Sequence, residues 1–256
     1  MLVANNFDCK VCDFGLAGLL RAREPSEIGS ETKERENTSS LGTLAWTAPE
    51  LFEDGDFTTS SDVYAFGVIM FEVLIQKPPF EGTLNHSIPY MVSMGRRPYD
   101  KVEFKEINES SNGGGEKVVA LMKQCCNPDP QERPSFKTIG ETLDEIGMEH
   151  CGGEEWISKV SEGRDASNIA ATENTNSRFA INPADLTLGP KLGAGNFGTV
   201  YEAIYQGTNV AAKEMIVARM TQQAKDEFYK ECSLMERCRH PNIGTCYNIG
   251  KCHLFI

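Results

Sequence analysis

An α+β fold in two unequal halves, joined by a linker, is the fold class that this sequence predicts. Residues 1–149 carry helical patterns separated by loops rich in proline and glycine, whereas residues 179–256 carry short runs typical of strands. Residues 150–178 are rich in Gly, Glu, Ser, Asn and Thr, a composition that buries too little apolar surface to order itself. We therefore expect a mainly α half, a flexible linker and a β-rich half, in that order.

The early half has its most apolar stretch at residues 65–75. This stretch is too short to span a bilayer and is interrupted by Gly67 and Glu72, so it predicts a helix of the protein core. Clusters of proline and glycine favour turns, and they predict loops at residues 78–79, 112–115 and 128–134. The rest of this half is expected to be mostly helical.

The late half is expected to begin with three strands, at residues 186–192, 199–205 and 209–215, with a turn at Gly207. A helix follows at about residues 221–239, and a final strand pair with a turn at Gly250 runs to Ile256. Helical spacing places Glu231 on the apolar face of that helix, in one stripe with Phe228, Cys232, Met235 and Cys238. A carboxylate in such surroundings needs a cationic partner or strong hydrogen bonds.

Composition limits the classes of partner. The net charge of −12 argues against nucleic acid or an anionic membrane as a partner, because both require clustered cations. Nine cysteines in a chain whose start lacks a secretory leader suggest free thiols in a reducing compartment. We therefore expect a cytoplasmic protein.

Two groups of cysteines have spacing that could suit a metal ion. Cys9 and Cys12 form a Cys-x-x-Cys pair, and Cys246, Cys252 and His253 form a looser group. Neither group has the second pair that would complete a zinc site. We favour a packing role for Cys9 and Cys12, which lie in a short β-like run. The alternative for Cys12 is a role as a reactive thiol.

A glycine-rich turn lies between the first two strands of the late half. Gly193, Gly195 and Gly198 have GxGxxG spacing, which in a dinucleotide-binding fold is followed directly by a helix. A strand is expected here instead, so we interpret the loop as a hairpin whose backbone N–H groups can approach phosphate oxygens, with Phe197 shielding them from water. The alternative is an ordinary glycine hairpin that binds no ligand.

The third strand of the late half ends in Lys213, after Val210, Ala211 and Ala212. Lys213 and Glu231 would each supply the charged partner that the other needs, because a cation on a strand and an acid on an apolar helix face form a charge-assisted pair. This complementarity favours the phosphate-binding interpretation over the ordinary hairpin.

The early half carries motifs of its own. Asp13, Phe14 and Gly15 form a DFG triplet, and residues 48–50 form an APE triplet. The APE triplet is preceded by the run GTLAW at residues 42–46 and followed by SDVYAFGV at residues 61–68. Such a combination is far more specific than a lone DFG, which could be a simple turn.

With these motifs the chain resembles the protein kinase superfamily, and residues 42–50 and 179–186 are similar to tyrosine-kinase-like serine/threonine kinases. In that family the glycine loop and its lysine precede DFG and APE, whereas here they follow. The resemblance therefore implies the C-terminal lobe of one kinase domain at residues 1–149, a linker at 150–178, and the N-terminal lobe of a second at 179–256.

The resemblance implies ATP and Mg²⁺ as cofactors. Lys213 would contact phosphates and pair with Glu231, and Asp13 would bind Mg²⁺; these three are the expected catalytic residues. The nucleotide would be held by Leu192, Gly193, Ala194, Gly195, Asn196, Phe197, Gly198, Val200, Ala211 and Lys213. Among them, Val200 and Ala211 would cover the adenine.

Two structural roles are also implied by the resemblance. Glu50 would pair with Arg133, and Asp62 would begin the central helix and anchor a catalytic loop. Acids in helical, apolar neighbourhoods need fixed partners, so we expect these residues to support the fold and not to catalyse.

The implied reaction is transfer of the γ-phosphoryl group of ATP to a hydroxyl of a protein substrate. Thr43 favours serine or threonine over tyrosine as the acceptor. Residues 22–41 would form the activation segment, and we hypothesise that phosphorylation falls among Thr38, Ser39 and Ser40, where a phosphate would pair with a basic cluster.

The HRDxxxxN loop, which supplies the catalytic base and a second metal-ligating residue, does not occur in the 256 residues. Met1 is expected to lie just after that loop in a tandem kinase. The alternative function is a non-catalytic, pseudokinase-like interaction module. Lys213, Glu231 and Asp13 would belong to two different active sites, unless the late half folds back through the linker into a permuted domain.

The central helix of the early half is apolar on several sides. Without the missing segments, we expect it to need a covering partner or to lower solubility, because of Phe66, Ile69, Met70, Val73 and Leu74.

Overall fold

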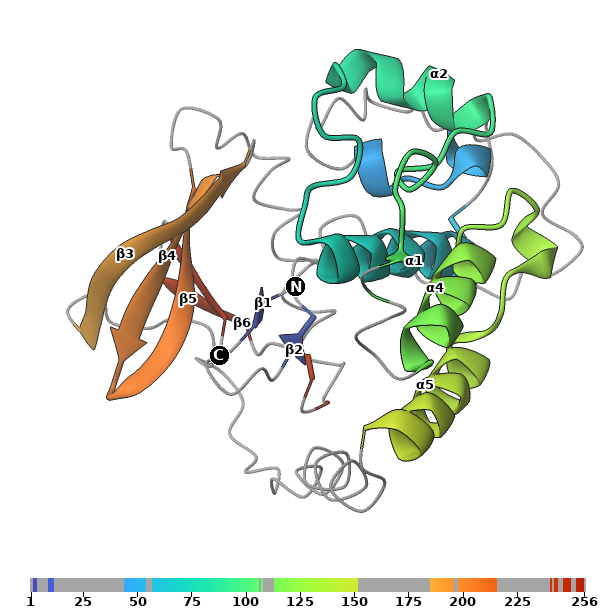
Figure 1. Ribbon diagram of the computed structural model, residues 1–256. Helices are drawn as coiled ribbons and strands as arrows, with labels where there is room; N and C mark the ends of the chain where they lie inside the picture. Colours follow the sequence, from blue (N-terminus) through green and yellow to red (C-terminus); the bar gives the residue numbers. More distant parts are fainter. Residues whose placement is uncertain are drawn as a thin grey trace, which may run out of the picture. The chain divides into compact units, whose positions relative to one another are not determined.

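The computed structural model describes residues 2–3, 9–11, 44–53, 57–105, 107, 113–151, 185–195, 198–215, 240, 242–243, 246–249 and 252–255. The chain divides into two compact units, one made of Met1–Leu19 with Ser161–Ile256 and the other of Leu20–Val160. Among the described residues, the strands belong to the first unit and the helices to the second, which confirms the α+β class (Figure 1). The units group residues 1–19 with the late residues, whereas the predicted division placed them with the helices.

Helix α1, Thr59–Ile75, is the central element of the helical unit, as its apolar sequence predicts. Thr58 caps its first turn: the Ser61 backbone N–H donates to Thr58 Oγ1 at 3.3 Å, and the Thr58 N–H donates to Ser61 Oγ at 3.0 Å. This reciprocal arrangement satisfies donors that the first helical turn leaves without partners. The helix ends at Gln76, whose φ of 57° is left-handed.

Two apolar clusters cover different faces of α1. Tyr64 and Val68 pack into a cluster with α2, Ile88–Ser93, and the short 3-10 turns Leu44–Trp46 and Pro49–Phe52. Val63, Met70 and Phe71 pack against α4, Gly114–Cys125, and Ile139 of α5, Phe136–His150. Burial on two faces explains why α1 is apolar nearly all round.

Gly67 allows α4 to approach α1 closely. A Cβ at this position would lie 2.7 Å from Cys126 Sγ and 2.8 Å from Cys125 Cβ, which is too close for any real contact. Any other residue here would therefore push the two helices apart.

The prediction that residues 112–115 form a loop is wrong at its end, because α4 begins at Gly114. Gly113 caps the helix with a φ of 90°, a conformation that glycine adopts without steric penalty. His150 packs directly against Gly114, where a Cβ would lie 3.0 Å from the His150 Cβ. Gly113 thus provides the turn that begins the helix, and Gly114 allows its close contact with α5.

The strand unit contains a five-stranded antiparallel sheet of order β3-β4-β5-β7-β6. Its strands are β3 Leu186–Gly195, β4 Gly198–Tyr205, β5 Thr208–Met215, β6 Cys246–Ile249 and β7 Cys252–Phe255. All five were expected from the sequence, and so was the turn at Gly207, whose φ is 82°. The helix expected at residues 221–239 and the turn at Gly250 lie outside the described residues.

β3 is an edge strand with two irregularities. Its register against β4 shifts between Leu188 and Lys191, and again between Lys191 and Gly193. Pro190 lies in the first shift, where an edge strand tolerates the missing N–H donor. At Gly189 a Cβ would lie 3.2 Å from the Glu202 carbonyl oxygen, so the close approach of β4 favours glycine.

A two-stranded ribbon opens the chain and belongs to the same unit as the sheet. β1, Leu2–Val3, pairs in antiparallel register with β2, Cys9–Lys10 (Figure 1). β2 confirms the short β-like run expected before DFG. Among the described residues, no helix is both long and apolar enough to cross a membrane.

Candidate functional site

Lys213 lies in a rung of paired residues that crosses four strands. Gly193 of β3 pairs with Val200 of β4, Val200 pairs with Lys213 of β5, and Lys213 pairs with His253 of β7. Directly paired residues project from the same face of an antiparallel sheet. The predicted lysine therefore shares one face and one rung with the predicted glycine loop and a predicted adenine contact.

The glycine-rich segment forms a tight hairpin between β3 and β4. Gly195 pairs with Gly198, so the connection consists of Asn196 and Phe197, which lie outside the described residues. Because β4 begins directly at Gly198, the dinucleotide-binding alternative, which requires a helix there, does not apply. The prediction of a hairpin turn is confirmed.

The space beside Gly193 in β3 is open. A Cβ built at Gly193 meets no atom within 4 Å, and the neighbouring Leu192, at the register shift, is 58% exposed. Ala194, which pairs with Thr199, is exposed as well. An accessible backbone is what a phosphate-binding turn requires.

Val200, Ala211 and Lys213 lie on one face of the sheet. Val200 and Lys213 are paired, and Ala211 is two residues from Lys213 along β5, so its side chain points to the same side. Val200 and Lys213 are half-buried, whereas Ala211 is 7% exposed. A small apolar surface thus adjoins a cation, a combination that suits a flat aromatic ring attached to phosphates.

The remaining predicted catalytic residues, Glu231 and Asp13, lie outside the described residues, so the ion pair between Lys213 and Glu231 stays a prediction. The same holds for residues 22–41, which include the hydroxyls of Thr38, Ser39 and Ser40. Among the described residues, no group of three or more His, Cys, Asp or Glu could hold a metal ion.

The segment just before DFG is hydrogen-bonded to a turn near the end of the chain. The Val11 N–H donates to the Asn242 carbonyl oxygen at 2.6 Å, and Asn242 Nδ2 donates to the Cys9 carbonyl oxygen at 3.0 Å. Val11 and Ile243 form a parallel β-bridge. Cys9 is exposed, so the packing role predicted for it is wrong.

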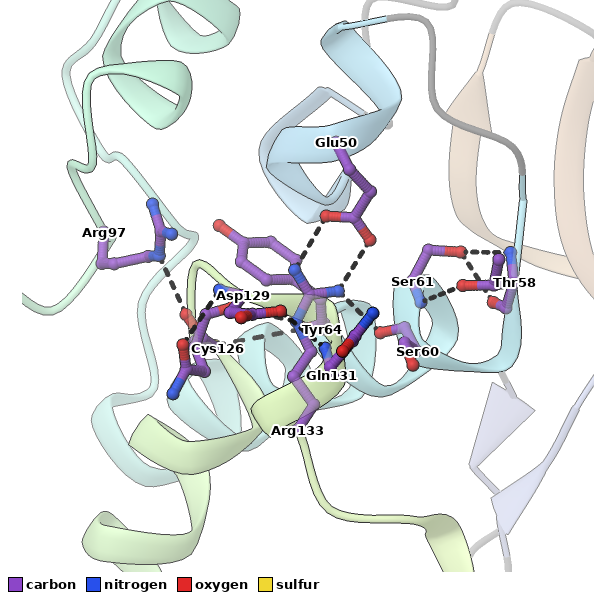
Figure 2. A network of polar contacts seen from close by, with 11 residues as sticks. Glu50, Thr58, Ser60, Ser61, Tyr64, Arg97, Cys126, Asp129, Gln131 and Arg133 are labelled. Atoms are coloured by element: carbon purple, nitrogen blue, oxygen red, sulfur yellow. Dashed lines mark hydrogen bonds and ion pairs between the residues drawn. The ribbon is translucent and has the colours of Figure 1, made fainter.

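Glu50 and Arg133 form a buried ion pair within the helical unit. Arg133 Nη1 and Nη2 each donate to one carboxylate oxygen of Glu50 at 2.7 Å (Figure 2). The arginine also donates to the carbonyl oxygens of Ser60, at 2.8 Å, and Asn127, at 2.9 Å. The predicted pair is confirmed, with bidentate geometry that fixes the APE segment to the start of α1.

Tyr64 lies against two guanidinium groups, a feature that the sequence did not reveal. The guanidinium carbons of Arg97 and Arg133 lie 5.4 and 5.2 Å from the centre of its ring. Arg97 is itself buried and donates to the Cys126 carbonyl oxygen at 3.0 Å (Figure 2). It also donates to the Val92 carbonyl oxygen at 3.1 Å. Burial raises the pKa of the Tyr64 hydroxyl above its ordinary value, so it stays protonated.

Trp46 is tied to α1 by a hydrogen bond that spacing alone could not predict. Its Nε1–H donates to Glu72 Oε2 at 2.8 Å. Glu72 had stood out in the sequence only as an interruption of an apolar run. The bond explains why α1 carries a carboxylate at this point and fixes the segment before APE to the helix.

The expected uncovered face of α1 is partly observed. Val73 is 61% exposed, whereas Met70 is 8% exposed and Phe66 contacts Phe136 edge to face at a centroid distance of 5.7 Å. Asp62, in the first turn, is exposed, although its partial burial raises the pKa of its carboxyl. Thus only part of the predicted apolar surface needs another partner.

Two family models match the chain. One described as "Protein tyrosine and serine/threonine kinase" matches residues 1–143, which is more than half of the 256 residues. One described as "Protein kinase domain" matches residues 186–253.

Individual proteins are similar to parts of the chain. A probable LIM domain-containing serine/threonine-protein kinase of Dictyostelium discoideum is 32% identical over 146 residues, 57% of this chain and 19% of that protein. A probable serine/threonine-protein kinase of the same organism is 34% identical over 139 residues, 54% of this chain and 11% of that protein. The tyrosine-protein kinase Srms of Mus musculus is 34% identical over 155 residues, 59% of this chain and 27% of that protein. The chain therefore spans well under half the length of these relatives.

Proposed function

The chain belongs to the protein kinase family, and from this premise we propose that it binds Mg-ATP in its late half. We further propose that it is part of a tandem kinase that transfers the γ-phosphoryl group of ATP to serine or threonine hydroxyls of proteins. ATP and Mg²⁺ are the cofactors that this family uses. Its cytoplasmic location is part of the same proposal.

The rung that joins Gly193, Val200 and Lys213 carries the nucleotide-binding part of the proposal. A nucleotide needs a cation and backbone N–H groups for its phosphates, and an apolar surface for its base. The sheet presents all three on one face: Lys213, the glycine hairpin, and the pair Val200 and Ala211. The described residues therefore suit the binding of a nucleotide.

Each predicted residue has a distinct task in this proposal. The hairpin backbone from Gly193 to Gly198 would hold phosphate oxygens, Leu192 would lie beside the nucleotide, and Val200 and Ala211 would cover the base. Lys213 would orient the α and β phosphates and be held in place by Glu231. Asp13 would bind Mg²⁺, which offsets the charge of the phosphates during transfer.

The acceptor is proposed to be serine or threonine. Thr43 precedes the APE segment, and the relatives from Dictyostelium discoideum are named serine/threonine-protein kinases. The similarity to tyrosine-protein kinase Srms makes tyrosine the competing acceptor. Phosphorylation among Thr38, Ser39 and Ser40 is proposed to order the segment between DFG and APE.

A second candidate function is a non-catalytic interaction module. It is favoured by one observation: no His-Arg-Asp triplet occurs in the 256 residues, so they lack the usual base for the acceptor hydroxyl. Binding of ATP without phosphoryl transfer would fit this function.

Phosphoryl transfer from γ-labelled ATP by the whole parent protein distinguishes the two. The kinase proposal predicts label in protein, on phosphoserine or phosphothreonine after acid hydrolysis, and its loss in Lys213→Ala. Label on phosphotyrosine alone would overturn the acceptor assignment. Tight Mg-ATP binding without any transfer would favour the interaction module.

A further inference from the structure

We draw no further inference here: the strongest candidate, the exposed apolar patch of Leu84, Tyr90 and Met94 at helix α2, has nothing among the described residues to show which partner covers it.

Discussion

Arg133 holds Glu50 with two hydrogen bonds of 2.7 Å, and the side chain of the arginine is completely buried. The pair joins the APE segment to a residue 83 positions later, across the start of α1. Bonds to two backbone carbonyl oxygens, the ring of Tyr64 and the carboxylate together surround the guanidinium. A charge held in this way depends on every one of its partners.

Glu50→Gln should destabilise the helical unit by about 3 kcal/mol, because it leaves a buried guanidinium without its counter-charge. The matched control is Glu141→Gln, which breaks an exposed pair with Lys137 whose nitrogen and oxygen lie 3.8 Å apart. That change should cost less than about 0.5 kcal/mol. Urea unfolding followed by circular dichroism measures both, and equal effects would contradict the role assigned to Arg133.

Gly67→Ala should destabilise the protein by about 1–3 kcal/mol, because the new Cβ would collide with Cys126 Sγ and Cys125 Cβ. Gly140→Ala is the control, since a Cβ there meets no atom within 4 Å and lies inside α5. Alanine favours a helix interior, so this control should gain about 0.5–1 kcal/mol. Thermal unfolding of the two variants should shift in opposite directions, and a neutral Gly67→Ala would refute the close approach of α1 and α4.

Cys125 and Cys126 should resist alkylation in the folded protein. Burial raises the pKa of the Cys125 thiol to about 11 and that of Cys126 to about 12, so almost no thiolate forms at about pH 8. Cys151 is exposed and should react readily. Mass spectrometry of iodoacetamide-treated protein should find label at the exposed Cys9 and Cys151 before it appears at Cys125 and Cys126, which should be labelled only after unfolding or as the pH approaches 11. Early label at Cys125 would contradict its buried position.

Asp62→Asn should stabilise the protein near neutral pH by about 0.3 kcal/mol, a small value because the carboxylate is largely exposed. Burial raises the pKa of Asp62 above its ordinary 3.8, so the folded state binds the proton more tightly than the unfolded state. The cost of the charge is therefore present above the folded-state pKa and disappears as the pH falls below the unfolded value. Urea unfolding of both proteins should show this stability difference near pH 7 and lose it at about pH 3, below the unfolded-state value. A stability difference between the two proteins that grows on acidification would contradict a raised pKa of Asp62.

Motifs with a local spacing predicted the fold well. The hairpin was predictable because a strand pattern followed the glycines directly, and α1 because its apolar run had the length of a core helix and not of a membrane span. The start of α4 was missed because three consecutive glycines usually indicate a loop. Here the close packing of His150 against Gly114 outweighs their low helix propensity.

The candidate site was predicted where both partners stand in motifs, as with Glu50 and Arg133. The contacts of Tyr64 with Arg97 and of Trp46 with Glu72 join residues whose separation has no periodic signature, so tertiary packing alone reveals them. The contact of Val11 with Asn242 was not predicted, because the sequence suggested only that the late half could fold back through the linker. Its hydrogen bonds lie between distant backbone groups, which no side-chain pattern encodes.

The most direct test of the nucleotide site is the change in thermal stability that Mg-ATP causes in the full chain. A ligand at ten times its Kd should stabilise the folded state by about 1.4 kcal/mol. Lys213→Ala should abolish this shift. The control Lys191→Ala should keep it, because Lys191 pairs with Tyr201 on the opposite face of the sheet. A full shift in Lys213→Ala, or no shift in the unmodified protein, would contradict the assignment of this sheet as the ATP-binding surface.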